Sequence, residues 1–225
     1  MIAYLRTRSP ALVVLLMLGA GLAAASPGQL GSRPAGDWIA LMERPERIVS
    51  LKVDHIVDAL DLRPGLTVAD VGAGAGAFSL ALAQAVGVGG TVYAEDVDPA
   101  FVTRIEQKAA GAGAANVRAV LGTYADPQLP ARDVDLGFMH DVLHHIENPA
   151  GYLKTLAGYL KPGGRLAIVE YDGPRGPHRS NPALQVTREQ LDAWMAAAGF
   201  VPDTVVDGLF GPADPRWFVI YRRQP

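Results

Sequence analysis

The sequence predicts an α/β fold in which a doubly wound, mostly parallel sheet carries helices on both faces. Short apolar segments alternate with segments of helical periodicity through most of the chain, which is the order in which helices connect parallel strands. A glycine-rich turn follows the first apolar segment directly. The last two strand-like segments follow one another without a helix, which favours an antiparallel hairpin on one edge of the sheet.

The helices are predicted from apolar residues at helical spacing and from their stop signals. The second of them ends before Arg63-Pro64-Gly65, where proline and glycine do not continue a helix. Helices are expected at residues 37–42, 48–60, 77–86, 100–110, 150–160 and 188–198.

The strands are predicted from short apolar runs between these helices. The run at residues 66–72 is apolar at successive positions, which suits a strand buried on both faces of the sheet. Strands are expected at residues 66–72, 91–95, 117–121, 134–139, 165–171, 204–209 and 217–222.

The composition is that of one globular domain with a short extension. Of the 225 residues, 49% are hydrophobic, which excludes a disordered chain. The 20 Lys and Arg nearly balance the 23 Asp and Glu, so nucleic acid is not an expected partner. The absence of cysteine excludes disulfides, thiolate nucleophiles and iron–sulfur clusters. No spacing of His, Asp and Glu predicts a metal site.

The first 25 residues form a separate segment. Arg6 and Arg8 precede an uncharged apolar run, and Ala23 and Ala25 form a small-residue cleavage site. This pattern is typical of a secretory signal peptide, and an N-terminal membrane anchor that stays uncleaved is the alternative. Either predicts a domain that is exported (periplasmic or secreted) or membrane-anchored, with any membrane association through this segment.

The folded domain is expected to follow a short linker. Residues 26–36 are rich in Pro, Gly and Ser and form the predicted linker. The domain then spans residues 37–225, without an internal repeat or a second boundary.

The glycine-rich turn is the most informative segment. Gly72, Gly74 and Gly76 stand at alternate positions between a buried strand and a helix, so a ligand can approach the backbone without obstruction by side chains. The spacing differs from the dinucleotide fingerprint Gly-x-Gly-x-x-Gly, and Asp70 precedes the first glycine. A carboxylate at that place suits a cationic ligand better than a pyrophosphate.

Two further acids end the next strand. Glu95 and Asp96 occupy the position from which a carboxylate can accept both hydroxyls of a ribose. Together with the glycine turn, they predict a site for an adenosine that carries a positively charged tail.

Four segments together resemble the class I S-adenosylmethionine-dependent methyltransferases. They are, in the family's order, Asp70-Val-Gly-Ala-Gly-Ala-Gly76, Val92-Tyr-Ala-Glu-Asp96-Val-Asp-Pro99, Asp135-Leu-Gly-Phe-Met-His-Asp-Val-Leu-His-His-Ile-Glu-Asn-Pro149 and Leu160-Lys-Pro-Gly-Gly-Arg-Leu-Ala-Ile-Val-Glu170. The resemblance implies a Rossmann-like, seven-stranded, mostly parallel sheet with an antiparallel terminal strand. It also implies S-adenosyl-L-methionine as the cofactor and donor of a methyl group.

The resemblance assigns the donor-binding residues. Asp70, Gly72, Gly74 and Gly76 go to the methionine part of the donor, and Asp96 goes to its ribose. Glu95 is then expected to be a strand-end charge, with the ribose as its alternative role.

The loop at residues 122–127 matches the segment that lies against the adenine. Relatives often have an acid directly after the glycine, whereas this chain has Thr123 there. Thr123, Tyr124 and backbone groups are therefore the candidates for the adenine contact. Asp126 either joins them or forms the turn before Pro127.

Candidates for catalysis follow the fourth strand, at the edge where such sheets bind ligands. A hydroxyl acceptor needs a general base, and His144 and Asp141 are the catalytic candidates. Adjacent helical residues point about 100° apart, so His144 and His145 cannot face the site equally. Relatives often have a histidine at the position of His145, and the resemblance implies that it packs or caps, with catalysis as the alternative. His140 either lines the site or ends the strand.

Two further groups have open roles. Tyr171, His178 and Arg179 either form a wall for the acceptor or lie in a solvent loop. Arg44 or Arg47 either meets the donor's carboxylate or belongs to a solvated run of charges.

The predicted function is methyl transfer to a small-molecule acceptor of a lipid or quinone-like class. The alternative is a Rossmann-like module that binds an adenosine ligand without transferring a methyl group. An NAD(P)-dependent oxidoreductase is disfavoured by the glycine spacing and by Asp70. The sequence predicts neither the methylated atom nor the oligomeric state.

Overall fold

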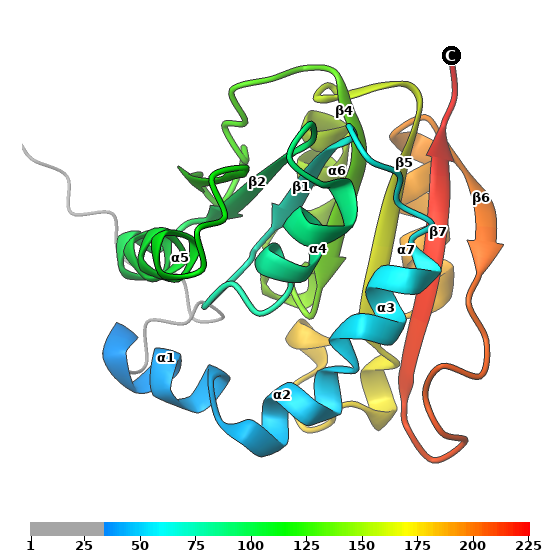
Figure 1. Ribbon diagram of the computed structural model, residues 1–225. Helices are drawn as coiled ribbons and strands as arrows, with labels where there is room; N and C mark the ends of the chain where they lie inside the picture. Colours follow the sequence, from blue (N-terminus) through cyan, green and yellow to red (C-terminus); the bar gives the residue numbers. More distant parts are fainter. Residues whose placement is uncertain (1–33) are drawn as a thin grey trace, which may run out of the picture.

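The computed structural model describes residues 34–225 and has the predicted α/β fold (Figure 1). Its strands are β1 (Thr67–Val71), β2 (Thr91–Asp96), β3 (Val117–Leu121), β4 (Val134–His140), β5 (Leu160–Tyr171), β6 (Phe200–Val205) and β7 (Arg216–Arg223). They form one sheet of seven strands in the order β3-β2-β1-β4-β5-β7-β6. Strand β7 is antiparallel to both of its neighbours, and every other pairing is parallel. The antiparallel terminal strand is confirmed: β7 is inserted between β5 and β6, and the two last strands form the expected antiparallel hairpin at one edge of the sheet.

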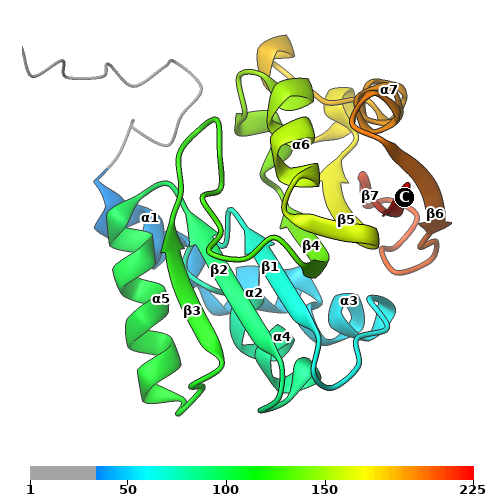
Figure 2. The same cartoon turned by 90° about the horizontal axis from the view of Figure 1, so that it is seen from above.

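Helices cover both faces of this sheet. They are α1 (Ala35–Met42), α2 (Pro45–Leu51), α3 (Val53–Ala59), α4 (Ser79–Val86), α5 (Pro99–Gly111), α6 (Pro149–Ala157) and α7 (Arg188–Ala197), with short 3₁₀ helices η2 (Leu143–His145), η3 (Gly173–Arg175) and η4 (Pro182–Leu184). Figure 2 shows α3 and α4 on one face and α6 and α7 on the other. Consecutive residues of β5 therefore enter different cores: Leu166 and Ile168 pack with α6 and α7, whereas Ala167 and Val169 pack with α3 and α4.

Three elements differ most from the sequence prediction. The helix expected at residues 48–60 is broken at Lys52, which has a left-handed φ of 53° and donates from Nζ to the carbonyl of Leu209 at 2.7 Å. Strand β5 begins at Leu160, five residues early, because Leu160 pairs with Val134 before a register shift. Strand β6 begins after the turn at Gly199 and not at residue 204.

The strand order reverses between β1 and β4. The chain runs outward from β1 to β2 and β3 and then returns to β4 on the other side of β1. The carboxyl ends of β1 and β4 therefore diverge at this point, which is where open α/β sheets bind ligands.

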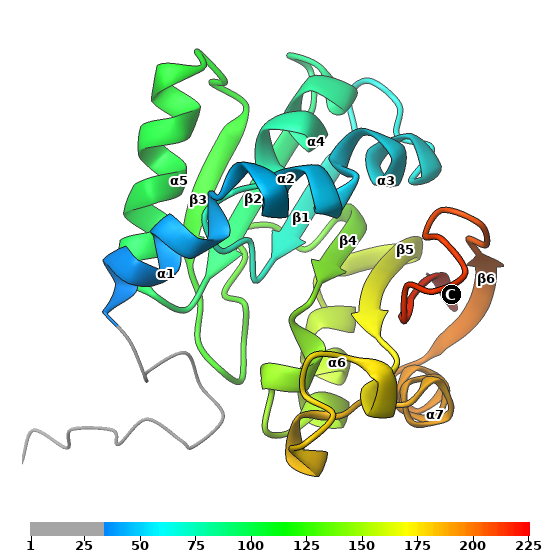
Figure 3. The same cartoon turned by 90° about the horizontal axis from the view of Figure 1, so that it is seen from below.

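The first two helices lie across this reversal point. Figure 3 shows α1 and α2 running from α5 toward α3. Glu43, which follows α1, accepts hydrogen bonds from both the Nε (2.9 Å) and the Nη2 (2.8 Å) of Arg104 on α5, and Lys108 lies 3.5 Å away. This bidentate pair fixes the end of α1 to α5.

The predicted signal peptide or anchor (residues 1–25) and most of the predicted linker lie outside the described residues. Helix α1 begins at Ala35, inside the range predicted for the linker. Among residues 34–225, no helix has the length and hydrophobicity needed to cross a bilayer.

We predict that Leu136→Ala destabilises the fold strongly. Leu136 lies on β4 and is fully buried in the core beneath α3 and α4. Removing a buried leucine side chain costs about 2–5 kcal/mol in the free energy of unfolding. Urea unfolding measures this cost, and Val88→Ala at a fully exposed position is the control. Equal losses in both variants would contradict the assigned core.

Candidate functional site

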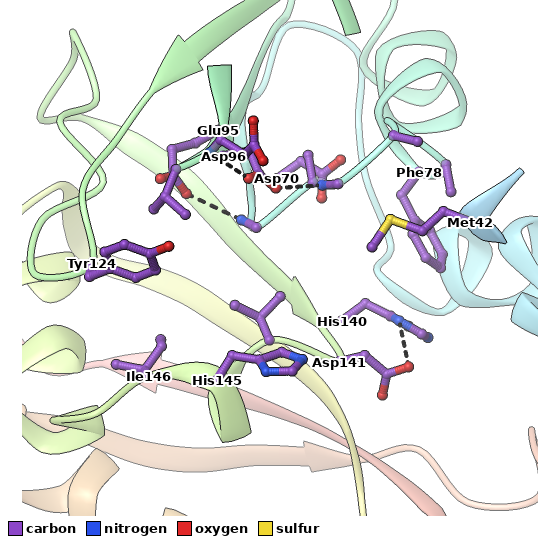
Figure 4. A pocket seen from close by; sticks show the side chains of 18 of the residues that line it. Met42, Asp70, Phe78, Glu95, Asp96, Tyr124, His140, Asp141, His145 and Ile146 are labelled. Carbon is purple, nitrogen blue, oxygen red and sulfur yellow. Dashed lines mark hydrogen bonds and ion pairs between the residues drawn. The ribbon is translucent and has the colours of Figure 1, made fainter. Parts of the chain in front are cut away.

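A cavity of about 250 Å³ opens at the carboxyl ends of β1, β2 and β4, beside the point where the strand order reverses. Figure 4 shows Asp70, Glu95 and Asp96 gathered on one side of it, with Tyr124, Ile146 and His145 on the other. Met42 and Arg47 reach it from the N-terminal helices. The cavity is thus built from both halves of the sheet and roofed by α1 and α2.

The turn after β1 requires its glycines. Gly72, Gly74 and Gly76 have φ values of 67°, 55° and 69°, in the left-handed region that side chains disfavour. A Cβ at Gly72 would lie 2.5 Å from Cγ2 of Val142, and one at Gly74 would lie 3.1 Å from Sδ of Met42. Gly72 and Gly74 line the cavity, whereas Gly76 packs beneath it at the entry to α4.

The two acids at the end of β2 hold this turn. The amide of Gly72 donates to Oε2 of Glu95 at 3.2 Å, and the amide of Gly74 donates to Oδ2 of Asp96 at 2.8 Å. Asp96 also accepts from the amide of Asp98 at 3.0 Å. These bonds fix the glycine backbone against β2 and point the carboxylates at the cavity.

All three acids of this wall have raised pKa values. Burial raises the pKa of Asp70 to about 7, although the hydroxyl of Ser79 donates to it at 2.7 Å. Burial, with the nearby Asp96 and Asp70, raises the pKa of Glu95 to about 8, against the hydrogen bond from Gly72. Burial also raises the pKa of Asp96. The buried Oε1 of Glu95 has no hydrogen-bond partner, so this wall suits a cation and a hydroxyl donor.

The loop after β3 supplies part of the opposite side. Thr123 and Tyr124 both line the cavity, and the Tyr124 side chain is half exposed. Asp126 points elsewhere: its Oδ1 accepts from the hydroxyl of Tyr159 at 2.7 Å and from the amide of Gln128 at 2.8 Å. Asp126 therefore forms the turn, the second of the two roles expected for it.

His140 and Asp141 line the cavity at the end of β4. Asp141 has a left-handed φ of 58°, and its buried Oδ1 has no hydrogen-bond partner. Burial and the nearby Glu170 raise the pKa of Asp141 to about 7. Burial and the charges of Arg216 and Arg47 lower the pKa of His140 to about 3, so this imidazole is neutral near pH 7.

The two adjacent histidines take different positions. His144 is buried and donates from Nδ1 to Oε1 of Glu170 at 2.8 Å, and it is not among the residues that line the cavity. Burial lowers the pKa of His144, but the hydrogen bond and charge of Glu170 outweigh it, so the pKa lies above its usual value. His145 lines the cavity, although the sequence favoured His144 as the catalytic candidate.

Some predicted residues lie apart from the cavity. Arg47 lines it, whereas Arg44 does not. Tyr171, His178 and Arg179 are also absent from its lining. The residues that line the cavity without having been predicted are mainly apolar, and they include Met42, Leu51, Phe78, Val142 and Ile146 together with Tyr152. No periodicity reveals them, because they come from separate elements that meet only in the fold.

Comparisons with known proteins agree with this geometry. Residues 69–168 match the family described as a methyltransferase domain. The Nocamycin O-methyltransferase of Saccharothrix syringae is 33% identical over 123 residues, which cover 55% of this chain and 43% of that protein. An uncharacterized 37.1 kDa protein in a transposon of Streptomyces fradiae is 33% identical over 157 residues, which cover 69% of this chain and 43% of that protein. The chain therefore spans less than half the length of these curated relatives.

A solved structure extends the similarity to the whole fold. The SAM dependent methyltransferase from Aquifex aeolicus is 25% identical, with a TM-score of 0.72. The match covers 84% of this chain and 98% of that chain.

We predict that Glu95→Gln becomes progressively more stable, relative to the wild type, as pH rises. The folded, unliganded protein raises the pKa of Glu95 from its usual 4.5 to about 8. The stabilising contribution of this carboxyl is therefore present below about pH 4.5 and lost as pH rises through about 8. Glutamine does not titrate, so the difference in the free energy of unfolding should widen across this interval.

Urea unfolding without ligand, at several pH values, measures this difference. Glu147→Gln is the matched control, because Glu147 is exposed, and its curve should run parallel to that of the wild type. A Glu95→Gln curve that also runs parallel to the wild type would show that Glu95 is ionised in the fold.

Proposed function

We propose that this chain works as a class I S-adenosylmethionine-dependent methyltransferase and that it transfers the methyl group to a hydroxyl of a small, largely apolar acceptor. The observation that carries the proposal is the wall of buried acids around a glycine turn. These three carboxyls lie close together and have raised pKa values. A ligand that brings positive charge and hydroxyl donors stabilises their ionised forms.

Two features of the cavity support the assignment of this donor. Because positions 72 and 74 carry no side chain, the backbone of the turn is open to the cavity; a Cβ there would come too close to Val142 or Met42. The Oε1 of Glu95, which has no hydrogen-bond partner, lies in the same wall. When bound, S-adenosyl-L-methionine supplies an electrophilic methyl group on a positively charged sulfur. The protein's task is then to hold this group and orient an acceptor along its line of attack.

We assign the donor's parts to separate residues. Asp70, Gly72 and Gly74 face its methionine part, and Gly76 shapes the turn that presents them. Asp96 accepts from its ribose hydroxyls. We assign Thr123 and Tyr124 to its adenine, because both line the cavity.

The acceptor's class follows from the rest of the lining. The side chains of Leu51, Phe78 and Ile146 make this part of the cavity apolar, which suits an acceptor of a lipid or quinone-like class. A curated relative with 33% identity is named an O-methyltransferase, which supports oxygen as the methylated atom.

Asp141 is the residue that we propose as the general base. Its Oδ1 is buried without a partner in the cavity wall, and a pKa of about 7 allows it to take a proton near neutral pH. The positive φ at Asp141 is a backbone strain of the kind that functional positions retain. His140 beside it is a poor base, because its pKa is about 3.

We predict that Asp141→Asn lowers kcat by a factor of about 10²–10⁴ and leaves the dissociation constant of the donor nearly unchanged. In the wild type, kcat should rise as pH increases through about 7, because Asp141 must be ionised to accept a proton. The assay supplies methyl-labelled donor with metabolite and lipid extracts and follows transfer of the label. A protein that binds no donor would overturn the proposal, and an Asn variant with wild-type kcat would remove Asp141 from it.

We predict that Asp96→Ala weakens donor binding at least tenfold. Hydrogen bonds to a charged group contribute about 1.5–3 kcal/mol each, and about 1.4 kcal/mol corresponds to a factor of ten in affinity. Calorimetric titration of the donor measures the loss, with the exposed Asp58→Ala as control. If Glu95→Ala has the larger effect, the ribose contact belongs to Glu95 instead.

We also propose that the domain is exported or membrane-anchored through residues 1–25. The support is the basic start, the uncharged run and the small residues at Ala23 and Ala25. N-terminal sequencing of protein from fractionated cells tests this: a new terminus near Ser26 indicates cleavage. An intact Met1 in the membrane fraction indicates an anchor, and an intact Met1 in soluble cytoplasmic protein contradicts export.

A further inference from the structure

Three histidines that lie far apart in the sequence meet beside the cavity. His144 and His145 belong to η2 after β4, whereas His178 comes from the loop between η3 and η4. The ring of His144 lies 4.1 Å from that of His145 and 4.8 Å from that of His178, measured between centroids. One ring nitrogen of each histidine lies within 4.8 Å of those of the other two.

Glu170 orients one of these rings from behind. Its Oε1 accepts from Nδ1 of His144 at 2.8 Å and from the amide of Tyr171 at 2.9 Å, and its side chain is only 1% exposed. Because Nδ1 donates to the carboxylate, the lone pair of the neutral ring lies on Nε2. A buried carboxylate that holds one imidazole nitrogen and leaves the other as a ligand is the usual outer shell of a metal-binding histidine.

We propose that His144, His145 and His178 bind a divalent transition-metal ion, with His144 as a ligand through Nε2 and Glu170 as its positioning residue. Imidazole ligands suit zinc, copper, nickel and iron, whereas magnesium and calcium prefer oxygen. In the proposed function, none of these residues binds the donor or acts as the general base.

The spacing of the rings is compatible with such an ion. Three nitrogens at about 2.0–2.1 Å from a tetrahedral zinc ion are about 3.3 Å apart. Since the three nitrogens already lie within 4.8 Å of one another, each ring needs to move by about 1 Å or less. His178 lies in a loop between two short 3₁₀ helices, where such a movement costs little free energy.

The position of the ion gives it a role in the same reaction. Three protein ligands leave the fourth position of a zinc ion open, as in catalytic zinc sites. His145 is both a ligand and a part of the cavity wall, so the open position borders the cavity. An oxygen of the acceptor can bind there, and this role, unlike the metal site itself, rests on the proposed function.

Zinc titration of the full chain tests the site without donor or acceptor. The protein is purified without an oligohistidine tag, treated with a chelator and titrated with zinc chloride by calorimetry; cobalt absorption reports the ligand geometry. We expect one ion per chain. His178→Ala should weaken zinc binding more than a hundredfold, and Glu170→Gln should weaken it about 10–100-fold.

His55→Ala is the matched control, because His55 is an exposed histidine on α3, and it should bind zinc as the wild type does. Circular dichroism checks that each variant folds. If Glu170→Gln does not fold, zinc binding by His178→Ala is the test of the proposal. A wild type that binds no zinc at micromolar concentrations, or a folded His178→Ala that binds it as tightly, overturns the metal site. Donor titration of the same samples reports separately on the proposed function.

Discussion

The hydrogen bonds between the glycine turn and the end of β2 are the interaction on which the rest of the site depends. Parallel pairing places Val71 opposite Glu95, so the turn after β1 leaves the sheet beside the two acids that end β2. The amides of Gly72 and Gly74 donate to these acids. Because the turn is bonded to these two carboxyls, it buries them, and burial raises their pKa values. The bonds that shape the turn partly offset this effect, and the remaining cost of burying the charge is what a bound cation would relieve.

The cavity combines this acidic wall with a different chemistry on its other side. The end of β4 contributes Asp141 and His140, and η2 contributes His145. The two sides come from the two halves of the sheet, which diverge between β1 and β4. In the proposed function, a donor held by one half would be presented to groups of the other half, and neither half forms the complete cavity.

Much of the sheet and of the donor site follows from local sequence. Strand β3 has the predicted bounds, because it is a short apolar run between clear breaks. The tight turn at Gly72 and Gly74 could be predicted because their spacing directly after a buried strand allows few conformations. The break at Lys52 could not, since it depends on a hydrogen bond to Leu209, far away in the sequence. The sequence also could not show which of two adjacent histidines reaches the cavity, because Glu170 on another strand decides it.

The ion pair between Glu43 and Arg104 couples the N-terminal end of the domain mechanically to the cavity. The pair fixes the end of α1 to α5, and Met42, beside Glu43, lies against Gly74 over the cavity. The chain that precedes Pro34 leads directly into α1. A pulling force on that end is transmitted to the roof of the cavity before it reaches the sheet. Ligand would then leave faster under tension, and high salt would have a similar effect by weakening the partly exposed ion pair.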